Sequence, residues 1–230
     1  MALDAPRLPA HDLEDQIAPR PVSHSELVLR GRVWDVRRDT VDLGEAGTVV
    51  REYVDHPGAV AVLALREDRG APEVLLIKQY RHPVGALEWE LPAGLLDVEG
   101  EPPWRAAARE LAEEADLRAE RWDLLADYVS SPGGLSEALR VYLARDLSDV
   151  PDHELFEREH EELGMPTAWV ELDDAVEAVL TGRIRNATVA IGLLSAQAGR
   201  SRDWECLRAA DAPWPAHRSP GIVASSPETC

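Results

Sequence analysis

The sequence contains little cysteine and no long hydrophobic run. Cys206 and Cys230 are the only cysteines among 230 residues, and they lack the spacing of a metal site, so we expect reduced thiols in a cytoplasmic protein. No apolar stretch approaches the roughly 18 residues that a membrane-spanning helix needs. The sequence therefore predicts neither a disulfide scaffold nor a helical membrane protein.

Positive charge is also scarce. The chain has 24 Lys and Arg against 43 Asp and Glu, which gives a formal net charge of −19. Such a surface repels nucleic acid and anionic membranes, so we expect neither as a partner. It would also repel a phosphate-bearing substrate. A phosphate site in this chain therefore needs a bound cation and local arginines.

One segment has the composition of a short, well-defined helix. Pro102 and Pro103 suit a first helical turn, where a missing N–H costs little. The stretch from Trp104 to Ala115 then contains no Gly or Pro and is rich in good helix formers. At about 100° per residue, its predicted apolar stripe comprises Trp104, Ala107, Ala108, Leu111 and Ala115.

Carboxylates gather on another side of this helix. Glu110 and Glu114 are four residues apart, and Glu113 lies three residues from Glu110, so the three share one side, which we expect to be exposed. Clustered carboxylates repel one another unless a cation joins them. Hard oxygen ligands of this kind suit Mg²⁺ or Mn²⁺.

The segment resembles the signature of Nudix hydrolases, G-x5-E-x7-R-E-U-x-E-E-x-G-U, in which U is a bulky aliphatic residue. Two positions depart from it: six residues separate Gly94 from Glu101, and Asp116 replaces the last glycine. Aspartate tolerates the left-handed conformation that this glycine would adopt at the helix end. The matching residues are Gly94, Glu101, Arg109, Glu110, Leu111, Glu113, Glu114 and Leu117.

Over about residues 30–198 the chain is similar to the ADP-ribose pyrophosphatase branch of that family. The likeness rests on residues 51–62, 79–84 and 89–94, and on Ser131–Gly134 with Glu137 following. It implies hydrolysis of ADP-ribose to AMP and ribose 5-phosphate. Another nucleoside diphosphate sugar or an oxidised nucleotide is the alternative substrate. A nucleotide-sensing module without catalysis is the alternative of another class, which the intact carboxylates disfavour.

The resemblance also implies a metal site. The backbone carbonyl of Ala93 and the side chains of Glu110 and Glu114 would bind Mg²⁺, with Mn²⁺ as the alternative ion and Glu113 as a further candidate ligand. Such an ion neutralises phosphate charge and lowers the pKa of water. Arg109 would orient a carboxylate through a bidentate pair. Glu101 is either an exposed loop acid or helix cap, or a residue that supports the site.

A second acidic cluster spans residues 157–162 and by itself is typical of a solvated loop. In the branch, a glutamate on such a mobile loop takes a proton from the attacking water. Glu159 is therefore the first candidate for the general base and Glu161 the second. His160 is a weaker rival.

Four residues are candidates for substrate contact. Arg51 and Arg81 would bind the phosphates or ribose, since a guanidinium matches phosphate, or each forms a structural ion pair instead. Trp34 either occupies a core position or stacks on adenine. Gly134 belongs to the turn that resembles the branch.

The pattern of apolar runs predicts an α/β fold, which in the resemblance is the Nudix α/β/α sandwich around a mixed sheet. Residues 1–55 would form an N-terminal β-rich arm, loose before about residue 25. Residues 56–198 would form the hydrolase domain, and residues 199–230 a flexible tail. An antiparallel strand set with tight turns is predicted over residues 25–54. Further strands are predicted at 59–65, 74–80, 122–130, 138–144 and 167–172, and helices at 104–115, 173–180 and 186–198.

The arm also predicts an assembly. It is too small to bury its own apolar face, so a partner subunit would have to cover it. Members of the branch are usually homodimers with exchanged N-terminal strands. We therefore expect a homodimer in which Trp34 and Arg51 reach the neighbouring nucleotide pocket.

Overall fold

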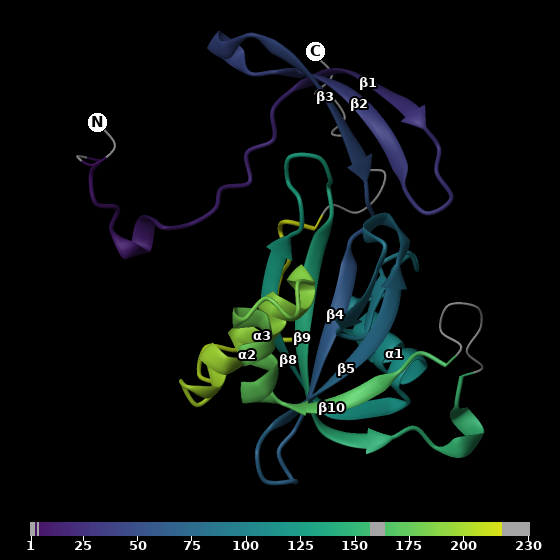
Figure 1. Ribbon diagram of the computed structural model, residues 1–230. Helices are drawn as coiled ribbons and strands as arrows, with labels where there is room; N and C mark the ends of the chain where they lie inside the picture. The colour runs from purple at the N-terminus through teal and green to yellow at the C-terminus, as the bar shows by residue number, and fades with distance from the viewer. Residues whose placement is uncertain (1–2, 4, 157–163, 218–230) are drawn as a thin grey trace.

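The computed structural model describes residues 3, 5–156 and 164–217, and it has two parts (Figure 1). An antiparallel three-stranded sheet forms an N-terminal arm that stands above the core in this view. Its strands pair in the order β1-β2-β3. They comprise β1 (Val22–Leu29), β2 (Asp35–Asp42) and β3 (Thr48–Asp55).

The core is built on a mixed eight-stranded sheet with the order β10-β5-β4-β9-β8-β11, in which β6 also pairs with β5 and β7 with β4. The central pair β4 and β9 is parallel, and the other pairs are antiparallel. The strands are β4 (Ala59–Arg66), β5 (Glu73–Arg81), β6 (Ala86–Glu90), β7 (Ala93–Leu95), β8 (Leu117–Val129), β9 (Ala138–Asp149), β10 (Thr167–Glu171) and β11 (Arg208–Ala209).

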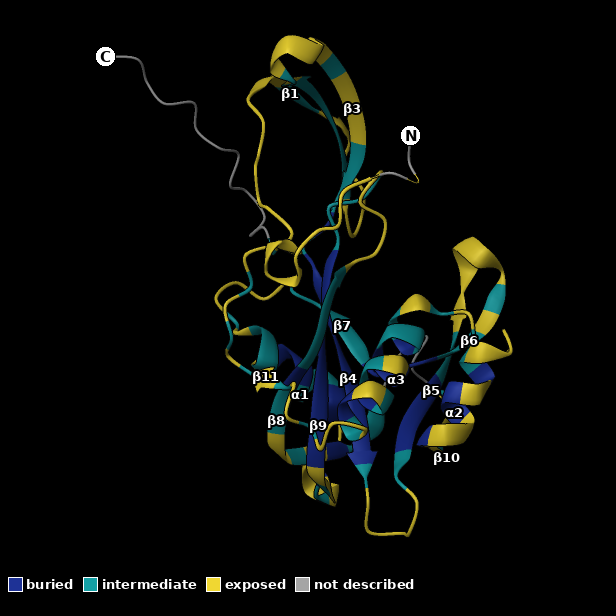
Figure 2. Ribbon diagram, turned by 90° about the vertical axis from the view of Figure 1, so that its left-hand side faces the viewer, coloured by how far each residue is buried: buried dark blue, intermediate teal, exposed yellow. Residues whose placement is uncertain are grey.

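Helices cover both faces of this sheet. The helix α1 (Pro103–Ala115) lies on one face, and α2 (Leu172–Leu180) and α3 (Ala187–Arg200) lie on the other (Figures 1 and 2). Side chains alternate along a strand, so Val60 and Val62 of β4 pack toward α1, while Ala61 and Leu63 pack toward α2 and α3. The α/β/α sandwich is therefore confirmed. Among the described residues, no helix has the length and apolarity needed to cross a membrane.

The helix α1 begins and ends where the sequence predicts. The helix begins at Pro103 directly after Pro102. At its other end Asp116 adopts φ 54°, and its N–H reaches the carbonyls of Ala112 and Leu111. The aspartate thus takes the left-handed position that the signature gives to glycine.

The buried face of α1 differs from the predicted stripe. Its buried residues are Ala106, Ala107, Leu111, Ala112 and Glu114. The expectation that Glu114 lies on an exposed face was therefore wrong. The helix contacts β7 as well as β4 and β8, so its polar side meets protein rather than water.

The arm is an antiparallel strand set with turns, as predicted for residues 25–54. Residues 30–34 connect β1 to β2, and Trp34 lies in this connection. A β-carbon on Gly31 would lie 2.0 Å from the carbonyl oxygen of Trp34, and the Gly31 N–H donates to Asp35 Oδ1 at 3.2 Å. The tight turn therefore requires glycine at position 31.

Residues 201–217 are packed against the core, contrary to the expected flexible tail from residue 199. The strand β11 pairs with β8. Arg140, which is 2% exposed, donates to the carbonyls of Ala212 and Pro213, and its guanidinium lies 4.6 Å from the Trp214 ring. We call residues 208–217 the C-terminal strap.

Candidate active site

The signature glycine makes room for a carboxylate. A β-carbon built on Gly94 would lie 2.0 Å from both Cδ and Oε1 of Glu110. The loop from β7 and the helix α1 therefore approach so closely that no side chain fits between them. Glycine at this position places the Glu110 carboxylate directly against the backbone of β7.

Glu114 is oriented by the same strand. Its side chain is buried, and its Oε2 accepts a hydrogen bond from the Ala93 N–H at 2.8 Å. The structure thus brings Ala93, Glu110 and Glu114 together where β7 meets α1. These are the residues that the resemblance to Nudix hydrolases implies as metal ligands.

Arg109 contacts three carboxylates. Its bidentate partner is Glu101, with Nη2–Oε2 at 3.1 Å and Nε–Oε1 at 3.3 Å. Its Nη1 lies 2.6 Å from Glu110 Oε1 and 3.1 Å from Glu113 Oε2. The hydrogen bond to Glu101 is the main cause that raises the pKa of Arg109. Glu101 is therefore not an exposed loop acid. Its pair with Arg109 connects the signature loop to α1.

The surroundings of Glu110 disfavour an unpaired negative charge. Burial raises the pKa of Glu110, the charge of Arg109 lowers it, and the charges of Glu113 and Asp97 raise it further. The carboxylate thus lies where an additional cation would be stabilising.

The residues fit a divalent cation by the chemistry of their donors. Within the described ranges, no three His, Cys, Asp or Glu side chains surround one metal position, and Arg109 bridges Glu110 and Glu113. The three glutamates nevertheless supply hard oxygen donors, as Mg²⁺ prefers. The Gly94 cradle holds one of them at the strand, so an ion here would compete with Arg109 for its carboxylates.

The candidates on the arm are exposed. Trp34 is 46% exposed, so a core position is wrong, and its ring lies 5.3 Å from that of His56. Arg51 donates to the neighbouring carbonyl of Val50 at 2.9 Å. Among the residues that the structure describes, Arg51 has no ion-pair partner within 4.0 Å.

Arg81 and Gly134 belong to the part of the fold below the arm, not to the arm itself. Arg81 forms a bidentate pair with the buried Glu90, at 2.8 and 2.7 Å, which is the structural ion pair considered as the alternative. The carbonyl of Gly134 accepts a hydrogen bond from the Val54 N–H at 2.9 Å. Gly134 is therefore fixed to the last part of β3.

The candidates for the general base lie outside the described residues. Glu159, Glu161 and the rival His160 belong to residues 157–163, of which the structure gives no account. Their roles stay predictions.

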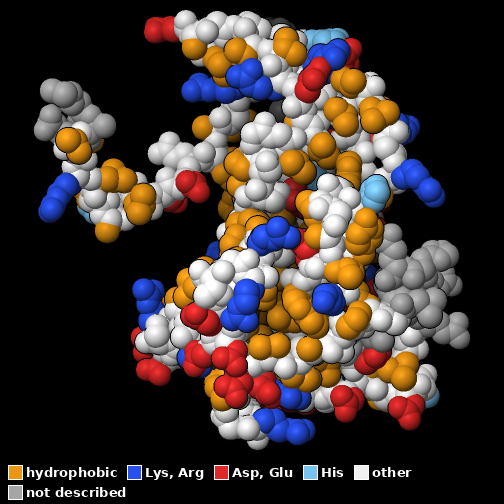
Figure 3. Space-filling model, in the orientation of Figure 1, with side chains coloured by type: hydrophobic (Ala, Val, Ile, Leu, Met, Phe, Trp, Pro, Cys, Tyr) orange, Lys and Arg blue, Asp and Glu red, His pale blue; other side chains and the backbone are white. Residues whose placement is uncertain are grey.

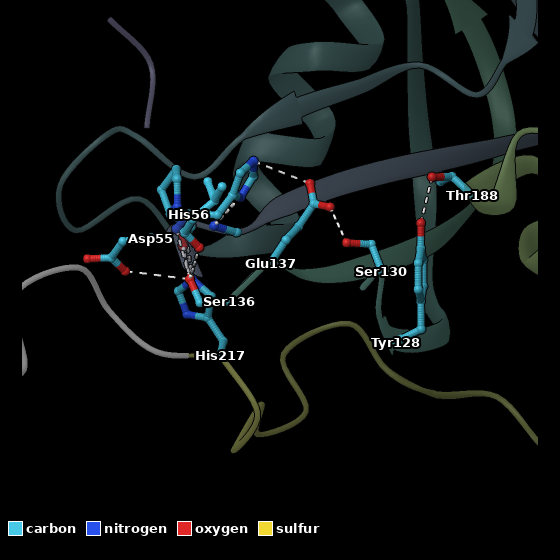
Figure 4. Close-up of polar contacts among 11 residues, drawn as sticks. Asp55, His56, Tyr128, Ser130, Ser136, Glu137, Thr188 and His217 are labelled. Carbon is cyan, nitrogen blue, oxygen red and sulfur yellow. Dashed lines mark hydrogen bonds and ion pairs between the residues drawn. The ribbon is translucent and has the colours of Figure 1, made fainter. Parts of the chain in front are cut away.

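A polar cluster beside the arm was not assigned a role in the sequence analysis (Figure 4). His56 Nε2 lies 3.3 Å from Glu137 Oε1, and the other oxygen of Glu137 accepts from Ser130 Oγ. The Tyr128 hydroxyl lies 2.6 Å from Thr188 Oγ1. Burial raises the pKa of Tyr128, and the nearby charge of Glu137 adds to the effect. These residues come from distant segments, so only the fold unites them.

Comparison with known proteins identifies the family. Residues 55–190 match the model of the NUDIX domain, and the chain belongs to the Nudix family. It is 43% identical over 174 residues to the ADP-ribose pyrophosphatase of Mycobacterium tuberculosis, covering 76% of this chain and 81% of that protein. It is 34% identical over 169 residues to the ADP-ribose pyrophosphatase of Bacillus subtilis, covering 73% and 87%.

A solved structure supports the fold. The crystal structure of an ADP compounds hydrolase superposes with a TM-score of 0.67 at 20% identity, covering 83% of this chain and 100% of that one. Nudix hydrolases generally use a divalent metal ion.

Proposed function

We propose that this protein hydrolyses the pyrophosphate of ADP-ribose to AMP and ribose 5-phosphate. The observation that carries the proposal is the close approach of β7 to α1, which brings Ala93, Glu110 and Glu114 together. The two relatives called ADP-ribose pyrophosphatases support the choice of substrate.

We assign the metal site to the Ala93 carbonyl, Glu110 and Glu114, with Glu113 as a further ligand and Mg²⁺, or else Mn²⁺, as the ion. The bound ion supplies charge neutralisation and a lower pKa for water. Arg109 holds Glu110 and Glu113 in place through its ion pairs with them.

The remaining roles concern proton transfer and substrate contact. Glu159 takes a proton from the attacking water, with Glu161 as the alternative base. Trp34 stacks on adenine, and Arg51 contacts phosphate or ribose. Because Arg81 is held by Glu90, its contact with substrate comes through the exposed part of its guanidinium, and Gly134 contributes backbone.

We also propose a homodimer in which the arm serves the partner's site. Figure 3 shows hydrophobic side chains over the arm and on the core beneath it. Val28 is 44% exposed and Val33 is 56% exposed, so this apolar surface of the arm is open to a partner subunit. Further exposed apolar residues of the arm are Val22, Leu27, Leu29, Trp34 and Val50. A second copy would bury this surface.

A substrate panel tests the proposed function. The purified full-length chain is incubated with Mg²⁺ and ADP-ribose, a UDP-sugar, a GDP-sugar or an oxidised nucleoside triphosphate, and the products are identified by chromatography. We expect AMP and ribose 5-phosphate from ADP-ribose with the highest kcat/KM. Faster cleavage of another compound would favour the alternative substrate. Binding of ADP-ribose without cleavage would favour the sensing module.

A further inference from the structure

His56 lies where four segments of the chain meet. It follows β3 directly, and its side chain is 4% exposed. The ring of Trp34 packs on its ring at 5.3 Å with an angle of 32°. Glu137 approaches from the loop before β9, and His217 of the C-terminal strap reaches the carbonyl of the adjacent Pro57 at 2.9 Å. Figure 4 shows Glu137 and Ser136 beside His56, with His217 nearby.

The contacts of His56 define its protonation. The Gly58 N–H donates to Nδ1 at 3.1 Å, so Nδ1 carries no proton. The proton therefore lies on Nε2, which faces Glu137 Oε1 at 3.3 Å. Burial lowers the pKa of His56, while the charge of Glu137 opposes this effect. The neutral ring thus accepts from Gly58 at Nδ1 and turns its Nε2–H side toward Glu137.

Backbone contacts join the same loop to the arm. The Val54 N–H donates to the Gly134 carbonyl at 2.9 Å, and the Ser136 N–H donates to the Val54 carbonyl at 3.0 Å. The His56 N–H donates to Ser136 Oγ at 2.8 Å. The turn at Ser131–Gly134 and the end of β3 therefore form one hydrogen-bonded unit.

We propose that His56 is a positioning residue for substrate binding. Its ring supports Trp34 on one side and holds Glu137 on the other, so it fixes the spacing between the arm and the Ser131–Gly134 turn. This inference rests on the proposed function, in which Trp34, Arg51 and Gly134 contact substrate. In the proposed dimer, the arm serves the partner's site and the turn serves its own. His56 then sets the distance between the residues that a chain contributes to its partner's site and the residues that it contributes to its own site.

Two substitutions distinguish the roles of the two nitrogen atoms of the ring. In His56→Gln the amide nitrogen extends to about the position of Nε2 and can still donate to Glu137. In His56→Asn the amide oxygen can accept from Gly58 in place of Nδ1, but the shorter side chain does not reach Glu137. Both variants lose the ring that packs on Trp34. They therefore form a pair in which each variant keeps one of the two polar contacts, His56→Gln the one with Glu137 and His56→Asn the one with Gly58.

The first readout is steady-state kinetics with ADP-ribose. We expect His56→Asn to raise KM by roughly 10-fold, the size of a lost polar contact with a charged group, with little change in kcat. His56→Gln should recover most of this loss. A fall in kcat at unchanged KM, or equal effects of both variants that follow their loss of thermal stability, would overturn the proposal.

The second readout is independent of turnover. Amide hydrogen exchange over residues 131–137 should accelerate in His56→Asn and stay near wild type in His56→Gln, measured equally far below each unfolding midpoint. Unchanged exchange in His56→Asn would overturn the proposal. If the wild type does not cut ADP-ribose, the proposed function fails. Acceleration confined to His56→Asn would then still support the positioning role.

Discussion

Glu110, Glu113 and Glu114 carry the same functional group in different surroundings. Glu110 lies against Gly94, Glu114 accepts from the Ala93 amide, and Glu113 contacts Arg109. Because Glu110 and Glu114 are both held at β7, small changes in that strand should act on the metal site. The neighbouring backbone therefore belongs to the site as much as the carboxylates do.

Gly94→Ala tests this dependence. The added methyl group would meet the Glu110 carboxylate at 2.0 Å and displace it. We expect a loss of metal affinity of roughly 10–100-fold, the range for changes just outside a metal's ligands. A titration of activity with Mg²⁺ measures it, and thermal unfolding checks the fold. Unchanged Mg²⁺ dependence in a folded variant would contradict the placement of Glu110.

The general base is tested by comparing two neighbouring glutamates. Glu159→Gln should lower kcat by roughly 10²–10⁴-fold, the usual effect of a general base, with little change in substrate affinity. Glu161→Gln is the matched control, because it makes the same change two residues away. Single-turnover rates at saturating substrate measure both. A comparable loss in Glu161→Gln alone would transfer the role to Glu161.

At the scale of elements, the C-terminal strap depends on one buried charge. Arg140 forms a bidentate pair with Asp127 at 2.7 and 3.0 Å and also donates to two strap carbonyls. Removing it leaves the two carbonyls without this donor and leaves Asp127 with the contact from Arg208. A buried arginine of β9 therefore connects the strap to the sheet.

Arg140→Met should destabilise the fold by about 3–5 kcal/mol, the usual cost of breaking a buried ion pair. Arg208→Ala is the control, because Arg208 also contacts Asp127 but its side chain is 49% exposed; we expect a cost within about 1 kcal/mol. Urea unfolding measures both. Equal costs would mean that burial does not decide the strength of these contacts.

The sequence predicted those features that depend on local patterns. The short apolar runs located the strands, Pro102 and Asp116 marked the ends of α1, and the signature located the carboxylates. The burial of Glu114 was missed because it depends on β7, which is distant in sequence. The packing of the strap was missed for a similar reason, since its partner Arg140 gives no local signal. His56 received no role because Trp34 and Glu137, which contact its ring, are distant in sequence.

At the scale of the whole molecule, the arm stands apart from the core and is largely exposed or half-buried, in contrast to the buried central strands (Figure 2). Its residues Trp34 and Arg51 are exposed. An arm of this kind serves a substrate site best when a second chain approaches it. The proposed homodimer accounts for both the apolar surface and the exposed candidates.

Sizing and subunit mixing test the dimer. Light scattering at micromolar concentration should give twice the chain mass of 25.3 kDa, and a monomer would refute the proposal. Inactive Glu114→Gln chains mixed with inactive Trp34→Ala/Arg51→Ala chains should form mixed dimers with one working site each. No recovery despite proven subunit exchange would mean that each site is built from a single chain.

The most direct measurement compares the wild type with Glu114→Gln in the conversion of ADP-ribose. Both full-length proteins are incubated with ADP-ribose across a range of Mg²⁺, and AMP and ribose 5-phosphate are quantified. We predict equal amounts of the two products from the wild type, only with added divalent metal. Glu114→Gln should lose most of this activity while remaining folded by circular dichroism. Other products from the wild type, or near-normal turnover by Glu114→Gln at low Mg²⁺, would contradict the account.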